Sequence, residues 1–323
     1  MPFDVFGMCN ALYDIQAEID EGLLEEVGFA KGGMFLIDEE RQRDIVAHVY
    51  THIVHSEAGG SGANTMLGIG LLGGSACYTS RVGPDDHGRL YHESLASKGV
   101  RPNLAIGSGD TGISLILITP DAERTMLTFL GEARALTRDD VDLESLRQSR
   151  YLYVTGYLWD TDNQKEAVSL AMTEANRAGV KVALSLSDPF CVGRHKDDFL
   201  ALIQRHVDVV FGNEDEAMAL TDAGSATEAA ARLGEWSEIA AVTMSERGSL
   251  IRHAGTTTEI PAFPAEAVDA TGAGDMYAAG LLYGLTNGSD LERAGRIGAY
   301  GASLVVSKLG PRLESIDLSG IGH

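Results

Sequence analysis

The chain has 323 residues, of which 44% are hydrophobic and 22% are charged, and its formal net charge is −22. This composition is typical of a globular protein with a core large enough to fold without disulfides or a structural metal. The acidic excess argues against a nucleic-acid partner, which would favour a basic surface. The sequence contains no run of about 20 apolar residues, so it predicts no membrane span. Residues 1–30 lack the basic and apolar regions of a signal peptide. We therefore expect a cytoplasmic protein without a membrane partner.

The first predicted strand runs from Phe3 to Cys9 and is followed by Asn10 and Asp14. The next notable segment, residues 57–65, contains adjacent glycines that let the backbone approach a ligand closely, and Asn64 offers both a donor and an acceptor. A plain glycine-rich turn before a helix is the alternative interpretation. Residues 68–73 form a literal G-x-G-x-x-G, but they continue the apolar run after Asn64. We interpret them as a helix packed through its glycines, not as a dinucleotide site.

Residues 112–119 and 124–130 predict two strands joined by a turn at 120–123. Their polar positions predict half-exposed strands with few buried contacts: Thr111, Ser114, Thr119, Thr125 and Thr128. A small antiparallel sheet of this kind would act as a lid that excludes water during phosphoryl transfer. We place the lid strands, inserted in a single domain spanning residues 1–323, at roughly 12–20, 32–37, 50–57 and 104–130.

From Tyr151 onward, strands alternate with helices. The predicted strands span residues 151–155, 180–186, 207–211, 239–244 and 248–252. Helical periodicity covers residues 163–177, a segment ending near residue 205, and a segment starting near residue 213. This alternation favours a parallel sheet with helices on both faces.

The strongest functional signal is the segment 269–275, Asp-Ala-Thr-Gly-Ala-Gly-Asp, at the start of an apolar helix. The backbone N–H groups of Gly272, Ala273 and Gly274 can converge on one anion, and the helix dipole favours negative charge there. Asp275 follows closely enough to accept a proton from an attacking hydroxyl. The alternative is an ordinary capped helix, but a cap needs neither two close glycines nor two aspartates. The segment therefore predicts a phosphoryl-transfer site with Asp275 as its base.

In their order and separation, these motifs resemble those of the ribokinase/PfkB family of carbohydrate and nucleoside kinases, over essentially the whole chain. The resemblance implies a ribokinase-like α/β fold, with a central mostly parallel sheet, helices on both faces and a small β-sheet lid. It implies ATP and Mg²⁺ as cofactors and transfer of the γ-phosphate to a hydroxymethyl group. Gly272, Ala273 and Gly274 would form the anion hole, with Asp275 as the base.

The resemblance also implies the substrate-binding residues, in which Asp14 holds substrate hydroxyls: Asn10, Asp14, Gly59, Gly60 and Asn64. Asn213 and Glu216 match an N-x-x-E motif that organises magnesium, through water, and the phosphates. The two would face the same side of a helix start, although Asn-Glu there is also a common cap.

The segment from Thr243 to Gly248 matches a nucleotide-contacting strand and turn, with Ser245 in place of a glycine. With Asn213, Gly272 and Gly274, these residues would bind the nucleotide, while the exact adenine contact stays open. Arg124 on the lid would stabilise charge on the transferring group, the alternative being a solvated arginine.

Segments 59–61, 186–190 and 211–214 are similar to those of adenosine kinases, so an adenosine-like nucleoside is favoured as the acceptor. An aromatic ring near Tyr157 or Trp159 is a candidate for stacking on its base. A sugar kinase of the same family, ribokinase- or fructokinase-like, remains an alternative, as does a catalytically inactive sensor of sugars or nucleosides. The sequence leaves open a monovalent cation such as K⁺ behind the anion hole, and a monomer or a homodimer.

Overall fold

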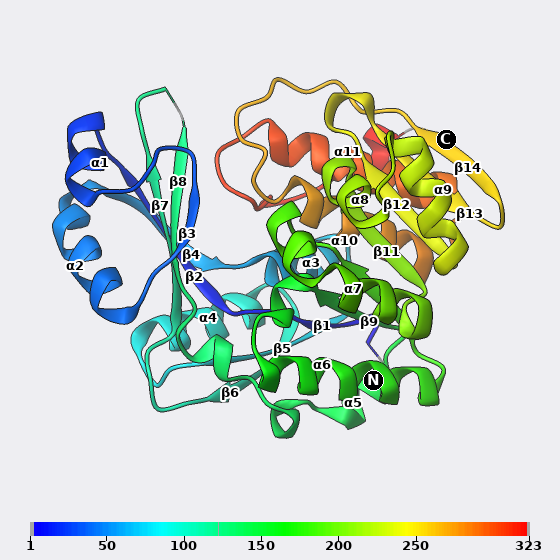
Figure 1. Ribbon diagram of the computed structural model, residues 1–323, viewed down its shortest axis with the longest axis horizontal. Helices are drawn as coiled ribbons and strands as arrows, with labels where there is room; N and C mark the ends of the chain where they lie inside the picture. Colours follow the sequence, from blue (N-terminus) through cyan, green and yellow to red (C-terminus); the bar gives the residue numbers. More distant parts are fainter. Residues whose placement is uncertain (1–2, 122, 322–323) are drawn as a thin grey trace.

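The computed structural model describes residues 3–121 and 123–321. Its larger sheet has nine strands in the order β14-β13-β12-β11-β10-β9-β1-β5-β6 (Figure 1). Neighbouring strands from β12 to β6 are parallel, whereas β13 and β14 add an antiparallel edge. The strands are β1 (Val5–Met8), β5 (Ala76–Val82), β6 (Val100–Ile106), β9 (Tyr151–Thr155), β10 (Lys181–Ser185), β11 (Val209–Asn213), β12 (Ile239–Thr243), β13 (Ser249–His253) and β14 (Thr256–Ile260).

Helices cover both faces of this sheet, because successive strand residues point to opposite sides. On β9, Tyr153 belongs to one hydrophobic core, whereas Leu152 and Val154 belong to the other. The first core is closed by α3 (Ser61–Leu71), α4 (Asp86–Ser97), α10 (Ala273–Thr286) and α11 (Leu291–Val306). The second is closed by α5 (Leu143–Arg147), α6 (Asp162–Ala178), α7 (Pro189–His206), α8 (Glu214–Thr221) and α9 (Ala226–Trp236). The predicted mostly parallel sheet with helices on both faces is confirmed.

The glycine-rich run at 68–73 does lie mostly on a helix, α3, which packs closely against α10. A Cβ added to Gly68 would lie 2.7 Å from the Cβ of Ala279. Such close packing brings the N-terminus of α3 beside the N-terminus of α10. No helix among residues 3–121 and 123–321 has the length and apolarity needed to cross a membrane.

The smaller sheet, which we call the lid, has the order β3-β8-β7-β2-β4. Its strands are β2 (Leu12–Glu18), β3 (Met34–Leu36), β4 (Ile53–Gly59), β7 (Gly112–Ile118) and β8 (Arg124–Phe129). The strands β7 and β8 pair antiparallel, as predicted for residues 112–119 and 124–130. The whole sheet is mixed, because β2 pairs in parallel with β7 and β3 with β8. Residues 104–106 belong to β6 of the large sheet, so the lid span predicted at 104–130 begins too early. Position 122 of the predicted turn lies outside the described residues.

The prediction of half-exposed lid strands is wrong. All five polar residues on which it rested are buried: Thr111, Ser114, Thr119, Thr125 and Thr128. Helices α1 (Glu21–Val27) and α2 (Glu39–Val49) pack on one face of the lid (Figure 1). Ser114 and Thr128 lie in register with Asp14 on the opposite face. Small hydroxyls are tolerated in this buried sheet where they find partners, as when Thr125 Oγ1 accepts from the Gly32 amide at 3.1 Å.

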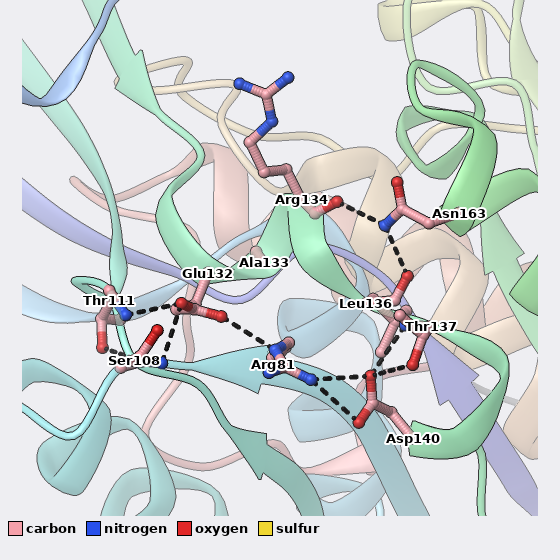
Figure 2. Close-up of polar contacts among 12 residues, drawn as sticks. Arg81, Ser108, Thr111, Glu132, Ala133, Arg134, Leu136, Thr137, Asp140 and Asn163 are labelled. Carbon is pink, nitrogen blue, oxygen red and sulfur yellow. Dashed lines mark hydrogen bonds and ion pairs between the residues drawn. The ribbon is translucent and has the colours of Figure 1, made fainter.

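Two of the segments that join the lid to the large sheet, those after β6 and after β8, meet in one polar network (Figure 2). Arg81 on β5 donates from Nε to Glu132 at 2.9 Å and from Nη1 to both oxygens of Asp140 at 3.2 Å. The other oxygen of Glu132 accepts from the amides of Ser108 and Gly109 at 3.1 and 2.6 Å. Ser108 and Gly109 follow β6 and lead into the lid, whereas Glu132 follows β8 and leads out of it. We call these five residues the hinge network.

Candidate functional site

The N-terminus of α10 presents backbone amides to open space. Gly272 is the N-cap residue with φ 77°. A Cβ on Gly272 would lie 2.4 Å from the Cβ of Pro311, whereas a Cβ on Gly274 would meet nothing within 4 Å. Among the described residues, the amides of Gly272, Gly274 and Asp275 find no hydrogen-bond acceptor. Free amides at a helix N-terminus suit a phosphate group. The Ala273 amide, also predicted for the anion hole, instead donates to the Ala270 carbonyl at 3.2 Å.

Asp275 lies beside these amides and is held by two side chains from the start of α3. Ser61 Oγ donates to its Oδ1, and Asn64 Nδ2 donates to its Oδ2 at 3.1 Å. Burial raises the pKa of Asp275 to about 6, against the lowering effects of these two bonds and of the Arg312 charge. A carboxylate with this pKa is mostly ionised at neutral pH and is a stronger base than an ordinary aspartate. This geometry allows Asp275 to accept a proton from a hydroxyl bound nearby.

Asp14 on β2 is buried beneath the two predicted glycines. A Cβ on Gly59 would lie about 2.0 Å from the Asp14 carboxylate, and a Cβ on Gly60, whose φ is 86°, would lie 2.7 Å from the Asn10 carbonyl. Glycine is therefore required at both positions. Burial raises the pKa of Asp14 to about 7, Arg312 lowers it, and Glu57 adds to the rise.

Asn10 is engaged within the protein. Its Oδ1 accepts from Gln164 Nε2 at 2.7 Å, and its Nδ2 donates to the Tyr157 carbonyl at 3.4 Å. Gln164 on α6 is fully buried. Its role was missed from sequence, because a glutamine within an amphipathic helix gives no signal of its own. Asn10 thus ties the first strand to the segment around Tyr157.

Asn213 and Glu216 form a reciprocal capping box at the start of α8. Asn213 donates to Glu216 from its amide at 3.1 Å and from Nδ2 at 2.7 Å, and its Oδ1 accepts from the Glu216 amide at 2.9 Å. Burial raises the pKa of Glu216 to about 7, the Asn213 amide opposes this, and the charge of Asp188 adds to it. The described residues contain no group of three or more His, Cys, Asp or Glu placed to hold a metal. A magnesium ion here would therefore depend on water and phosphate oxygens.

The predicted nucleotide-contacting turn follows β12, which ends at Thr243. Ser245 has φ 52°, in the left-handed region that glycine favours, and Gly248 has φ 84°. A Cβ on Gly248 would lie 2.1 Å from the Ile260 carbonyl oxygen. The backbone at Ser245 thus keeps a glycine-like conformation, although a serine there costs about 1 kcal/mol.

Arg124, at the start of β8, reaches from the lid to the anion-hole loop. Its Nη2 lies 2.7 Å from Asp269 Oδ2, and its Nη1 donates to Thr271 Oγ1 at 3.0 Å. The side chain is only 14% exposed, so the solvated alternative does not hold. Asp269 also accepts from the amides of Thr271 and Gly310. Because the Asp269 carboxylate is already engaged, a K⁺ ion at this carboxylate would have to displace Arg124.

Sequence reasoning missed Arg312, which belongs to no recognisable motif. Its Nε donates to Asn64 Oδ1 at 3.1 Å, and its Nη1 donates to Glu57 Oε2 at 3.4 Å. It lines a cavity of about 770 Å³ between the lid, α3 and residues 308–314. In Figure 1, a red loop near α11 faces the lid, whereas the C-terminus lies near β14. The loop of residues 308–314 thus closes one side of the site.

Residues 33–317 match the family model described as pfkB family carbohydrate kinase. Among solved structures, the adenosine kinase from Sinorhizobium meliloti is 37% identical, with a TM-score of 0.89 and 97% of each chain covered. A probable sugar kinase from Rhizobium etli CFN 42 is 36% identical, with a TM-score of 0.89 and coverage of 97% of this chain and 96% of that one. The 5-dehydro-2-deoxygluconokinase of Bacillus subtilis (strain 168) is 28% identical over 262 residues, which are 77% of this chain and 81% of the relative.

The structural matches extend to a putative Ribokinase II from E. coli, which is 19% identical with a TM-score of 0.83. The predicted ribokinase-like fold is confirmed. The kinase-named relatives also confirm the prediction of a phosphotransferase that acts on a hydroxyl group.

Proposed function

We propose that this chain, which belongs to the pfkB family of carbohydrate kinases, transfers the γ-phosphate of ATP to a hydroxymethyl group of a neutral, adenosine-like nucleoside. Membership of the family makes the chain a sugar or nucleoside kinase, and the nucleoside is the proposed part. The observation that carries the proposal is the position of Asp275. It combines a raised pKa, two hydrogen bonds from α3 and a place in the chain directly after Gly274, at the helix start with the free amides.

In the proposed reaction, Asp275 takes the proton from the acceptor hydroxyl as that oxygen attacks the γ-phosphate. The amides at the start of α10 stabilise charge on the transferred group, and Arg124 is close enough to help. Asp14 and Asn64 hold other hydroxyls of the acceptor. ATP supplies the phosphoryl group, and Mg²⁺ would neutralise its phosphates, with water oriented by Asn213 and Glu216.

Two observations support a nucleoside as the acceptor, and the charge described in the next paragraph supports a neutral one. One of the solved structures most similar to the chain is an adenosine kinase, at 37% identity. Phe190, in the first turn of α7, is 76% exposed, and the nearby Ser187 carbonyl accepts from the Tyr157 hydroxyl at 3.2 Å. An exposed aromatic ring can stack on a nucleobase. Trp159 does not fit this role, since it is buried and its indole donates to Asp198 at 2.7 Å.

The charge around Asp14 points the same way. The carboxylates of Asp14, Glu57 and Asp275 outnumber the two arginines that act on Asp14, Arg312 and Arg124, so an acceptor that carries its own carboxylate would meet net negative charge. A neutral sugar is the second candidate. It is favoured by the sugar-kinase names of the relatives, among them an uncharacterized sugar kinase of Archaeoglobus fulgidus.

An ATP-consumption assay with adenosine, other nucleosides, ribose, fructose and a sugar acid tests the proposal, with Asp275→Asn as the inactive control. We expect the highest kcat/KM with adenosine or a close relative. Phe190→Ala should raise the KM for nucleosides by roughly tenfold, as loss of about 1–3 kcal/mol of base stacking implies, and leave the KM for ribose unchanged. A sugar that exceeds every nucleoside tenfold would replace the nucleoside. Binding without any turnover would indicate a sensor.

A further inference from the structure

We propose that Arg312 is a positioning residue for the transfer, which orients Asn64 and through it the base Asp275. This inference rests on the proposed function, because it assigns Arg312 a part in the same reaction. Three side chains form a hydrogen-bonded chain: Arg312 Nε donates to Asn64 Oδ1 at 3.1 Å, and Asn64 Nδ2 donates to Asp275 Oδ2 at 3.1 Å.

The chemistry of the three side chains fixes the direction of this chain. An arginine N–H can only donate, and an ionised carboxylate can only accept. An amide between them must therefore turn its oxygen to Arg312 and its NH₂ group to Asp275. Without Arg312, the amide of Asn64 loses this bias, and the flipped orientation would place its oxygen against the base. Asn64 thus depends on Arg312 for the orientation in which its NH₂ group donates to Asp275. In that orientation, the remaining hydrogen-bonding capacity of the amide is available to the acceptor.

A second branch links Arg312 to the substrate-binding strand. Arg312 Nη1 donates to Glu57 at 3.4 Å, and Glu57 lies directly across from Asp14 in the β2–β4 ladder. Arg312 Nη2 is buried and finds no hydrogen-bond partner in the described part of the chain. An orphaned buried donor costs free energy until a ligand or water supplies an acceptor. The guanidinium therefore lies between the base and the acceptor-binding carboxylate, with one donor unused.

Arg312 also supplies the positive charge that the carboxylates of the cleft need. Burial raises the pKa of both Asp275 and Asp14, and Arg312 acts against the rise at each of them. Among the described residues, the other titratable groups that interact with the Asp275 charge are none of them cations: Asp14, Glu216, Cys9, Tyr153 and Tyr157. Loss of the Arg312 charge would therefore favour the protonated, inactive form of the base.

The backbone of the C-terminal loop holds Arg312 in place. The Gly310 amide donates to Asp269 at 2.8 Å, Pro311 packs against Gly272, and Lys308 Nζ donates to the Arg312 carbonyl. The loop that packs on the anion hole thus also carries Arg312. A shift of this loop would move both the wall of the anion hole and the side chain that orients the base.

The test compares Arg312→Gln and Arg312→Lys with Arg147→Gln, which removes an arginine whose exposed ion pair with Glu174 lies far from the site. With ATP and the best acceptor of the wild-type protein, we expect Arg312→Gln to lower kcat by about 10²-fold, the scale of a misplaced catalytic group. The acid limb of the kcat profile should move up by about one pH unit. Arg312→Lys should keep most of the pH profile but still lose rate, because an ammonium lacks the fixed fork of a guanidinium. Arg147→Gln should match the wild type.

Three results would overturn the inference: a wild-type kcat in Arg312→Gln, a lower Tm with an unchanged pH profile, or a raised acceptor KM with an unchanged kcat. A wild-type protein that turns over no acceptor would overturn the proposed function instead. In that case, a carboxyl NMR titration of Asp275 in the wild type and Arg312→Gln decides the matter, and equal titration midpoints would refute the role of Arg312.

Discussion

The catalytic cleft and the hinge network are built from the same residue types but are completed to different degrees. In the hinge, Arg81 and Glu132 bond to each other, and their remaining groups bond to Asp140 and to two backbone amides. In the cleft, Nη2 of Arg312 and the backbone amides of Gly272, Gly274 and Asp275 find no hydrogen-bond partner among the described residues. The polar groups of the hinge network are hydrogen-bonded without a ligand, whereas the cleft has unpaired donors that a ligand can bind.

The carboxylates of the two regions differ accordingly. Burial raises the pKa of Glu132, but the Arg81 bond and the Gly109 amide outweigh it, so the net pKa is lowered. The pKa of Asp275 and that of Asp14 are raised to about 6 and about 7. An ionised Glu132 therefore stabilises the fold at neutral pH, while ionised Asp275 and Asp14 destabilise it. This contrast separates residues held for stability from residues held for function.

The largest expected effect is on the cleft side. Asp275→Asn should lower kcat by about 10²–10⁴-fold, the scale of a general base. Its Tm at pH 8 should not fall, because the folded-state pKa of Asp275 is raised from 3.8 to about 6. The stability linked to this group is present below about pH 4 and is lost as the pH rises through 6. Steady-state kinetics and thermal melts at pH 4 and pH 8 check both points. Near-normal kcat at saturating substrate would remove Asp275 from its role.

Asp14→Ala should lower kcat/KM for the acceptor by roughly tenfold to a few hundredfold, because it leaves acceptor hydroxyls without a charged partner in a closed site. The KM for ATP and the Tm should change little. A variant that melts early while keeping its acceptor kinetics would place Asp14 with the hinge residues instead.

Glu132→Gln tests the opposite side of the comparison. Removal of its charge leaves Arg81 with a weaker partner, so we expect a loss of about 2 kcal/mol in the free energy of unfolding at pH 7. Because the folded-state pKa of Glu132 is lowered, this difference from the wild type should shrink as the pH falls below the pKa of the unfolded state. Urea denaturation at pH 7 and pH 4 measures it. Glu93→Gln, which removes an exposed i,i+4 pair with Arg89, should leave the free energy of unfolding nearly unchanged.

The pair Asn213 and Glu216 lies between the two classes, since it is a complete capping box within the cleft. The double variant Asn213→Ala with Glu216→Ala should raise the Mg²⁺ concentration for half-maximal rate severalfold, if the pair orients water around the ion. A magnesium titration of the rate distinguishes the roles. An unchanged midpoint with a lowered Tm would make the pair a helix cap alone.

The smallest effect concerns the motion of the lid. Hydrogen exchange in residues 112–118 and 124–129 should slow when an acceptor and a non-hydrolysable ATP analogue bind together, because the ligands complete the polar cleft beneath the lid. Exchange at the amides of Ser108 and Gly109 should change less, as Glu132 already binds them. Equal slowing at both places would mean that hinge and lid move as one unit.

The sequence predicted the parts of the fold that follow from local periodicity. The strand at Tyr151–Thr155 and the helix after it lie where the pattern placed them. The mixed pairing of the lid strands and their burial could not be predicted from local periodicity. They depend on the spatial order of distant strands and on the face of the sheet that α1 and α2 cover. The assignment of residues 1–323 to one domain stays a prediction.

The predicted site residues with a backbone signal, such as Gly59, Gly60 and Gly272, lie where glycine is structurally required. Gln164 and Arg312 were missed, because their contacts with Asn10, and with Asn64 and Glu57, span more than 150 residues of sequence. Such contacts leave no local pattern.

The contact between Gly272 and Pro311 has a consequence for synthesis of the chain. Asp14 and Asn64 emerge early, whereas the hole, the base and Arg312 lie between residues 269 and 312 of 323. Arg312 and Asn64 are 248 positions apart. A ribosome-bound chain can therefore pair most strands of the large sheet while its cleft still lacks one wall. The cleft is complete only when residues 308–314 pack against the start of α10 and Arg312 reaches Asn64.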